Sequence, residues 1–215
     1  MQWRVLILAA LAGTTLSANE IPAAIPDAGR RLNFTVLRNG DEVGRDLIDL
    51  DRRGTELKVK IQTQVVVQVA FVPVYRFEHT GMETWRDGQL VSLSSDTNDD
   101  GTQHRLAVTS QGSQLHIEAD GAASDAEPGL IPASLWNDRL VRQSVLLNTI
   151  DGSRMSVTVA RMGEEAVAVG KSTVPAQHYR VTGALERDLW YTAEGDLVRV
   201  AFDGPDGSHI AYVLR

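Results

Sequence analysis

From Leu32 to the C-terminus, short stretches of alternating apolar and polar residues are separated by glycine-containing turns. A two-residue period is typical of β-strands that bury one face and expose the other. Glycine, with asparagine or aspartate beside it, provides the positive φ angles that hairpin turns require. We expect turns at 38–42, 52–56, 86–89, 98–102, 110–114, 150–154, 161–165, 193–196 and 204–208. This pattern predicts an antiparallel β-meander.

The most regular alternation runs from Leu57 to Phe71. Every second residue is apolar or β-branched, and most of the intervening residues are lysine or glutamine. A strand that is buried on both sides would be apolar on both faces, so this strand has a single apolar face. At about 3.3 Å per residue it would span roughly 50 Å, well beyond the usual strand length. We therefore expect a strongly curled sheet or half-barrel, or a bulge near 65–67, and an interruption or edge position at Pro73.

Two segments depart from the strand pattern. Residues 120–130 are polar and glycine-containing, which predicts a flexible loop. Residues 133–142 follow a candidate N-cap at Ser134 and carry apolar residues at helical spacing, which predicts a short helix. The predicted fold class is thus all-β: a large curled antiparallel sheet or half-barrel with one short helix near 133–142.

The N-terminus has the layout of a secretory signal peptide. Arg4 precedes an apolar run over 5–11, and small residues lead to Ser17 and Ala18. The run is shorter than the roughly 20 residues that span a bilayer. We expect cleavage after Ala18, or nearly as well after Ser17. Residues 1–18 would then be a signal peptide, 19–31 a flexible lead-in and 32–215 a single antiparallel β domain in the periplasm or outside the cell.

Composition narrows the classes of function. The formal net charge is −7, which disfavours nucleic acids and anionic membrane surfaces as partners. The chain has no cysteine, so it has no disulfide bond and no thiol nucleophile. Its histidines, at 79, 104, 116, 178 and 209, lack zinc-site spacing. Asp96–Gly101 matches the front of a calcium loop, but Ala107 stands where the bidentate glutamate belongs, so a hairpin turn is favoured. No metal or cofactor is expected.

The sequence contains no nucleophile elbow, phosphate-binding loop or dinucleotide motif. His79, Glu83 and Trp85 form a candidate polar–aromatic cluster, for which cross-strand packing is the favoured interpretation. Trp85, Trp136, Trp190 and Tyr191 are candidates to stack a sugar or to line a lipid cavity, although tryptophan and tyrosine are more often core anchors.

Several phrases of the chain resemble a known family. They are PASLWN (132–137), VPAQHYRVTG (174–183), LWYTAEGDLVRVAF (189–202), DGSHIAYVLR (206–215) and YRFEHTGMETWRDGQLVSLSSDTNDDG (75–101). As a set they resemble an uncharacterised family of secreted β-proteins of Gram-negative bacteria, known as a domain of unknown function. The organisation is similar to that of Lol-type lipoprotein carriers, in which a curled antiparallel sheet wraps an apolar cavity. That second likeness concerns the fold and supports function only loosely.

The leading hypothesis is a non-enzymatic periplasmic binding protein or carrier for an apolar ligand, such as a lipid or acyl chain, held on the concave face of the sheet. The candidate ligand-facing residues are Val59, Ile61, Val65, Val67, Val69, Phe71, Tyr75, Trp85, Trp136 and Trp190. The alternative is an envelope structural or interaction protein with a fully packed interior. A hydrolase with a dispersed site is a third hypothesis. No segment after the N-terminus is long and apolar enough to cross a membrane, and the oligomeric state stays open.

Overall fold

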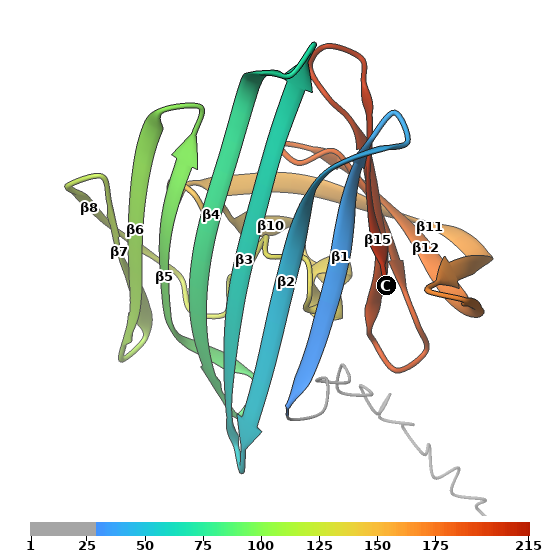
Figure 1. Cartoon of the computed structure of the whole chain (residues 1–215). Coiled ribbons are helices and arrows are strands. Elements are labelled where there is room, and N and C mark those ends of the chain that lie inside the picture. Colours follow the sequence, from blue (N-terminus) through green and yellow to red (C-terminus); the bar gives the residue numbers. More distant parts are fainter. Residues whose placement is uncertain (1–28) are drawn as a thin grey trace, which may run out of the picture.

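The computed structural model describes residues 29–215, so the expected signal peptide and its cleavage site lie outside the described residues. In this range fifteen strands form one sheet with two free edges. Figure 1 shows how the sheet is arranged. The strands are β1 (Arg30–Arg38), β2 (Asp41–Arg53), β3 (Glu56–Val69), β4 (Val72–Arg86), β5 (Gln89–Asp99), β6 (Thr102–Gln111), β7 (Gln114–Ala119), β8 (Ala122–Ala126), β9 (Ile131–Pro132), β10 (Val145–Leu147), β11 (Arg154–Val169), β12 (Ser172–Gly183), β13 (Arg187–Tyr191), β14 (Leu197–Asp203) and β15 (His209–Leu214).

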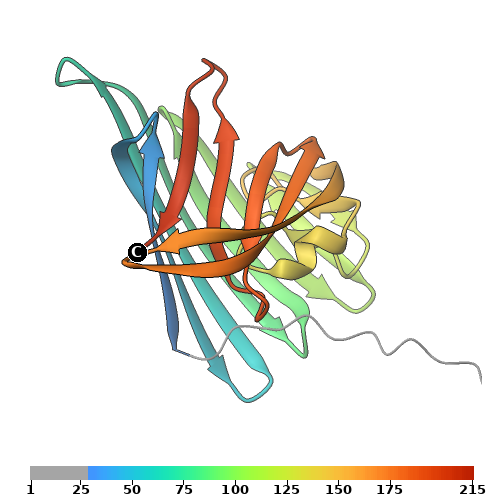
Figure 2. The same ribbon diagram turned by 90° about the vertical axis from the view of Figure 1, so that its right-hand side faces the viewer.

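The order in the sheet confirms the meander. It runs β8-β7-β6-β5-β4-β3-β2-β1-β15-β14-β13-β12-β11-β10-β9, and every neighbouring pair is antiparallel except β9 and β10. The first and last strands, β1 and β15, pair at the centre of the sheet. On either side of this pair the sheet curls, so that β1–β8 form one arm and β11–β15 form the other (Figures 1 and 2).

Residues 127–153, which we call the inner segment, lie between the two arms (Figure 2). Hydrogen bonds tie this segment to both arms. Ser95 on β5 donates to the carbonyl of Thr149 over 2.6 Å, and Tyr191 on β13 donates to the carbonyl of Leu135 over 2.6 Å. Its apolar side chains, among them Trp136, are buried in the core. The segment thus covers part of the apolar face that the curled sheet would otherwise expose.

Strand β3 confirms the predicted alternation over its first half. Leu57, Val59, Ile61 and Thr63 are buried, whereas Lys58, Lys60 and Gln64 are exposed. The expected bulge also occurs, between Val67 and Gln68. Pairing with β2 ends at Val65, so the β3–β4 hairpin continues beyond its neighbour. Val69 is exposed at its outer end.

The short helix differs from the prediction. The segment forms a single 3-10 turn over Asp138–Arg142, capped by Asn137, instead of a helix from 133 with Ser134 as the cap. Residues just before it cannot join a helix, because Ile131 and Pro132 pair as strand β9 and Leu135 has a φ angle of 67°. The apolar spacing that suggested a helix therefore reflects burial of an irregular segment.

Two other expectations were wrong. Residues 120–130 are not simply a loop, because Asp120 and Gly121 form the turn of a hairpin that leads into β8. Residues 161–165 do not form a turn: Gly163 lies inside β11 at a register shift, and the chain reverses later, at Gly170 and Lys171. Glycine at positive φ serves bulges as well as turns, which explains this error.

The long β11–β12 hairpin bends across β13–β15 on the outer side of the sheet (Figure 2). Its tip reaches the C-terminal strand, where the Gly170 amide donates to the carbonyl of Leu214 over 3.2 Å. Val167 and Ala176 on this hairpin are buried. Among the described residues, no helix is long and apolar enough to span a bilayer.

Candidate functional site

A cavity of about 140 Å³ lies on the concave side of the sheet, between the two arms and the inner segment. It is lined by Asp46, Ile61, Thr63, Phe77, His79, Ala133, Ser134, Leu135, Thr149, Ile150, Leu185, Arg187, Val200, Phe202 and Tyr212. Asp46, Ile61, Thr63, His79 and Val200 are buried and form its floor. The other lining residues are half-buried and form its mouth, which is mostly apolar.

A row of polar side chains crosses the floor. Asp46, Thr63, His79 and Thr97 stand directly opposite one another on the four neighbouring strands β2 to β5. The Thr63 hydroxyl donates to Asp46 Oδ1 over 2.6 Å, and His79 Nδ1 lies 2.8 Å from Thr97 Oγ1. Next to the row, Gly81 leaves room for the imidazole, since a Cβ there would lie 3.2 Å from His79 Nε2. The row is a continuous polar band across four strands, flanked by apolar side chains such as Ile61 and Ile48.

Burial shifts the ionisation of this row. Desolvation raises the pKa of Asp46 to about 6, against the opposing hydrogen bond from Thr63. Burial also lowers the pKa of His79. Both shifts favour the neutral forms, because a low-dielectric surrounding disfavours charge. Perturbed ionisable groups that line a cavity are typical of binding and catalytic sites.

Arg187, at the start of β13, lies on the opposite side of the cavity mouth. Its guanidinium carbon is 3.6 Å from the centre of the Phe202 ring, and its Nη1 donates to the carbonyl of Glu186 over 2.7 Å. Burial lowers the pKa of this side chain. Tyr212 on β15 completes this side of the cavity, and burial raises the pKa of its hydroxyl.

A second polar cluster lies further along β4, on the same inward face as His79. Glu83 accepts hydrogen bonds at Oε2 from the indole nitrogens of Trp85, at 2.7 Å, and Trp136, at 3.0 Å. Burial raises the pKa of Glu83. Glu83 Oε1 and the Ser134 hydroxyl are both buried, and neither makes a hydrogen bond of good geometry with a described residue. The nearby Ser134 hydroxyl nevertheless acts against the increase in the Glu83 pKa. Glu83 thus orients two core tryptophans, and His79 belongs to a different group.

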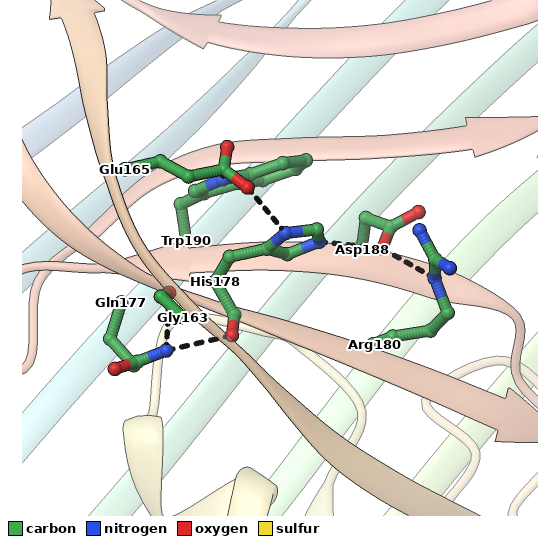
Figure 3. Close-up of polar contacts among 7 residues, drawn as sticks. All are labelled: Gly163, Glu165, Gln177, His178, Arg180, Asp188 and Trp190. Carbon is green, nitrogen blue, oxygen red and sulfur yellow. Dashed lines mark hydrogen bonds and ion pairs between the residues drawn. The ribbon is translucent and has the colours of Figure 1, made fainter.

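On the outer side of the sheet, the His178 ring contacts three side chains, one of which also binds Arg180 (Figure 3). His178 Nδ1 lies 2.8 Å from Glu165 Oε1 and its Nε2 lies 2.7 Å from Asp188 Oδ1. Trp190 stacks on the imidazole, with 4.3 Å between ring centres, and donates to Glu165 Oε2 over 2.9 Å. Arg180 Nε donates to Asp188 over 2.9 Å. The cluster joins β11, β12 and β13 and lines neither the concave cavity nor the hollow over β5–β8, so its geometry is that of a structural contact between the bent hairpin and the sheet.

A wider, open hollow of about 1100 Å³ lies over β5–β8. Its ionisable side chains are exposed or half-buried, and they already pair with one another, as His104 does with Asp120 over 2.8 Å. The smaller cavity combines burial with perturbed ionisable groups, so it is the better candidate site. In residues 29–215 no group of three or more histidine, aspartate and glutamate side chains is arranged to hold a metal ion.

The family model described as "Domain of unknown function (DUF6134)" matches residues 34–215, nearly the whole of the described sheet. The chain belongs to this family. No curated protein matches it. The DUF6134 match covers every residue that lines the cavity, so the candidate site is part of the family domain.

Within the DUF6134 domain the ten predicted ligand-facing residues do not form one surface. Ile61 lines the cavity, whereas Val59, Trp85 and Trp136 are packed in the core next to it. Trp190 lies in the outer His178 cluster, on the face opposite to its neighbours Leu189 and Tyr191. The remaining five lie toward the outer end of the β3–β4 hairpin: Val65, Val67, Val69, Phe71 and Tyr75.

The sequence analysis missed Asp46, Arg187 and Tyr212. The position of Asp46 could have been recognised in the sequence. Asp46 shares one face of β2 with Ile48 and Leu50, and the residues of the other face are exposed or half-buried. A charged residue in an apolar set marks a position where burial and charge conflict. Arg187 left no comparable signal, since only the curling of the sheet brings β13 opposite β2–β4.

Proposed function

We propose that this domain is a non-enzymatic binding protein that holds the apolar end of an amphipathic molecule, such as a lipid or acyl chain, in the concave cavity. One observation carries the proposal: the cavity has a buried floor and a half-exposed mouth lined by Phe77, Leu135, Ile150, Leu185 and Phe202. Ligand sites are commonly concave, mostly apolar and supplied with a few polar groups that fix orientation.

Size limits what the cavity holds. Its volume of about 140 Å³ is close to that of engineered protein cavities, roughly 150 Å³, that bind benzene. A whole lipid is far larger than this. The cavity therefore suits the end of a chain or a single ring, with the rest of the molecule passing out through the mouth.

A titration of the purified protein with 1-octanol, followed by two-dimensional amide NMR, tests the proposal. We expect saturable shifts at residues of the floor, including Thr63, His79 and Val200. Ile150→Trp places a large ring at the mouth and should abolish these shifts. Val213→Trp is the matched control, because Val213 is also half-buried but lies on the opposite face of β15 from Tyr212 and does not line the cavity, and it should leave binding intact.

A second candidate function is a structural or interaction protein with a packed interior. The observation in its favour is the filled part of the concave side, where Trp85 and Trp136 pack edge to face with 5.7 Å between ring centres. In that case octanol should cause no saturable shift in the unmodified protein or in either folded variant. Such a result would overturn the binding proposal.

A further inference from the structure

We propose that Arg187 recognises an anionic headgroup, a carboxylate or a phosphate monoester, at the mouth of the cavity. This inference rests on the proposed binding function and adds the chemical class of the ligand. A ligand of this class has an apolar end that enters the cavity and a negative charge that stays at the rim.

The first support is the pairing of Arg187. Most arginines of residues 29–215 lie within ion-pair distance of a carboxylate, for example Arg31 with Asp49, Arg86 with Glu56 and Arg180 with Asp188. Arg187 makes no ion pair with any described residue, and its one hydrogen bond is to the neighbouring carbonyl of Glu186. A guanidinium has five N–H donors, so most of its capacity remains for a ligand.

The second support is the position of the guanidinium. The guanidinium carbon of Arg187 lies over the Phe202 ring, 3.6 Å from its centre. This stacking holds a long, flexible side chain in one place. Arg187 is half-buried at the rim, where water screens a charge less than it does on an open surface. A fixed, partly desolvated guanidinium is suited to bind a carboxylate or phosphate through two parallel hydrogen bonds.

The third support is the distribution of charge around the cavity. Asp46 is on the floor, hydrogen-bonded to Thr63, and is the only carboxylate among the lining residues. An anionic group is therefore disfavoured at the floor and favoured at Arg187. This arrangement orients the ligand with its tail inward. For molecules with the same tail, the difference in affinity between a neutral and an anionic headgroup therefore reports the contact with Arg187.

Isothermal titration calorimetry with octanoate, octyl phosphate and 1-octanol tests the inference, because the three probes share one alkyl chain. We expect at least one of the two anions to bind about tenfold more tightly than octanol, the difference that one charge-assisted contact of about 1.4 kcal/mol produces. The comparison of octanoate with octyl phosphate then identifies the headgroup. This arm uses the unmodified protein, so it does not depend on the folding of a variant.

Arg187→Met keeps the apolar stem and removes the charge. It should weaken binding of the preferred anion about tenfold and leave octanol within about twofold. Arg53→Met is the control, because Arg53 is exposed at the end of β2 and does not line the cavity, and it should change neither affinity. Equal binding of octanol and both anions to the unmodified protein would overturn the role of Arg187 while leaving the proposed function intact. If none of the three probes binds, the proposed function itself is wrong.

Discussion

The two ends of the β3–β4 hairpin carry the same kind of alternating sequence but lie in opposite environments. At the inner end, Val59 is fully buried between Leu50 and Glu83 on the flanking strands. At the outer end, Val69 is 60% exposed and Phe71 is 94% exposed. The two strands of the hairpin pair with each other at both ends, so pairing within the hairpin does not separate them. The difference is the presence of a second layer.

The second layer exists only at the inner end. There the inner segment and the β11–β15 arm face β3 and β4, and their side chains complete the core. Val65 is the last residue of β3 that pairs with β2, and the outer end of the hairpin extends beyond it. Nothing in the described chain covers this outer end. An alternating sequence therefore identifies an apolar face, whereas the fold of distant segments determines whether that face is buried. Exposed apolar patches of this kind are typical of contact surfaces and of sites of self-association.

A charge placed at each end of β3 gives the largest expected contrast. Val59→Glu would bury a carboxylate directly beside Glu83 and should lower the free energy of unfolding by more than about 4 kcal/mol, because neither charge has a basic partner there. Val69→Glu points into water and should change it by less than about 0.5 kcal/mol. Urea titration at constant m-value measures both. Similar losses for the two variants would show that the outer end is also covered, and the comparison would fail.

Sequence alone predicted much of the fold, because strands and turns depend on local chemistry. The alternation over Leu57–Thr63 gave the correct inward face, and asparagine–glycine or aspartate–glycine pairs marked half of the hairpins. The end of that strand was not predictable in the same way. Its turn is formed by Ala70 and Phe71, which carry no turn signal, so the apolar run continued without a visible boundary.

At the inner end, burial also affects an ionisable group, Asp46. Its pKa is about 6 in the folded protein and near 3.8 ordinarily. The folded state thus binds a proton between these pH values that the unfolded chain has released. The contribution of Asp46 to stability is therefore greatest below about pH 4 and is lost as the pH rises through 6, a change of about 3 kcal/mol.

Asp46→Asn removes this dependence while keeping an oxygen that accepts the Thr63 hydrogen bond. The variant should match the unmodified protein near pH 4 and exceed its free energy of unfolding by up to about 3 kcal/mol near pH 7.5. Asp49→Asn, on the same strand, is the control, because Asp49 is a partly exposed partner of Arg31. Urea titrations across this pH range provide the measurement. If the free energy of unfolding changed with pH in the same way for Asp46→Asn and the unmodified protein, the pKa of Asp46 would not be raised by burial in the folded state.

The candidate site was much less predictable than the strands. Its lining comes from β2, β3 and β4, from the inner segment and from residues 185–212, and these three parts are far apart in the sequence. Residue pattern reveals which side of a strand faces inward, but not which strand it will face. Arg187 illustrates this limit: nothing around it in the sequence distinguishes it from arginines such as Arg180, which pairs with Asp188 on the outer side.

The smallest expected effect concerns the turn at the outer end. Four hairpins of the first arm turn at an asparagine or aspartate followed by glycine, with both residues at positive φ: Asn39–Gly40, Asp87–Gly88, Asp100–Gly101 and Asp120–Gly121. The β3–β4 turn adopts the same conformation with Ala70 at 50° and Phe71 at 69°. Side chains with a Cβ are disfavoured at positive φ by roughly 1 kcal/mol or more, and glycine is not.

Replacing Ala70 and Phe71 together by Asn and Gly should therefore raise the free energy of unfolding by about 1 kcal/mol, because it relieves backbone strain and removes no buried contact. The same change removes the most exposed aromatic ring of the described chain, so fluorescence of a dye that binds apolar surface should decrease. Asn39→Ala with Gly40→Phe provides the reverse control in a turn of the same conformation, and it should cost more than about 1 kcal/mol because it also removes the hydrogen bond that Asn39 Oδ1 accepts from the His209 amide. A loss of stability at residues 70 and 71 would show that Phe71 packs against something in solution, and that the outer end is covered like the inner one.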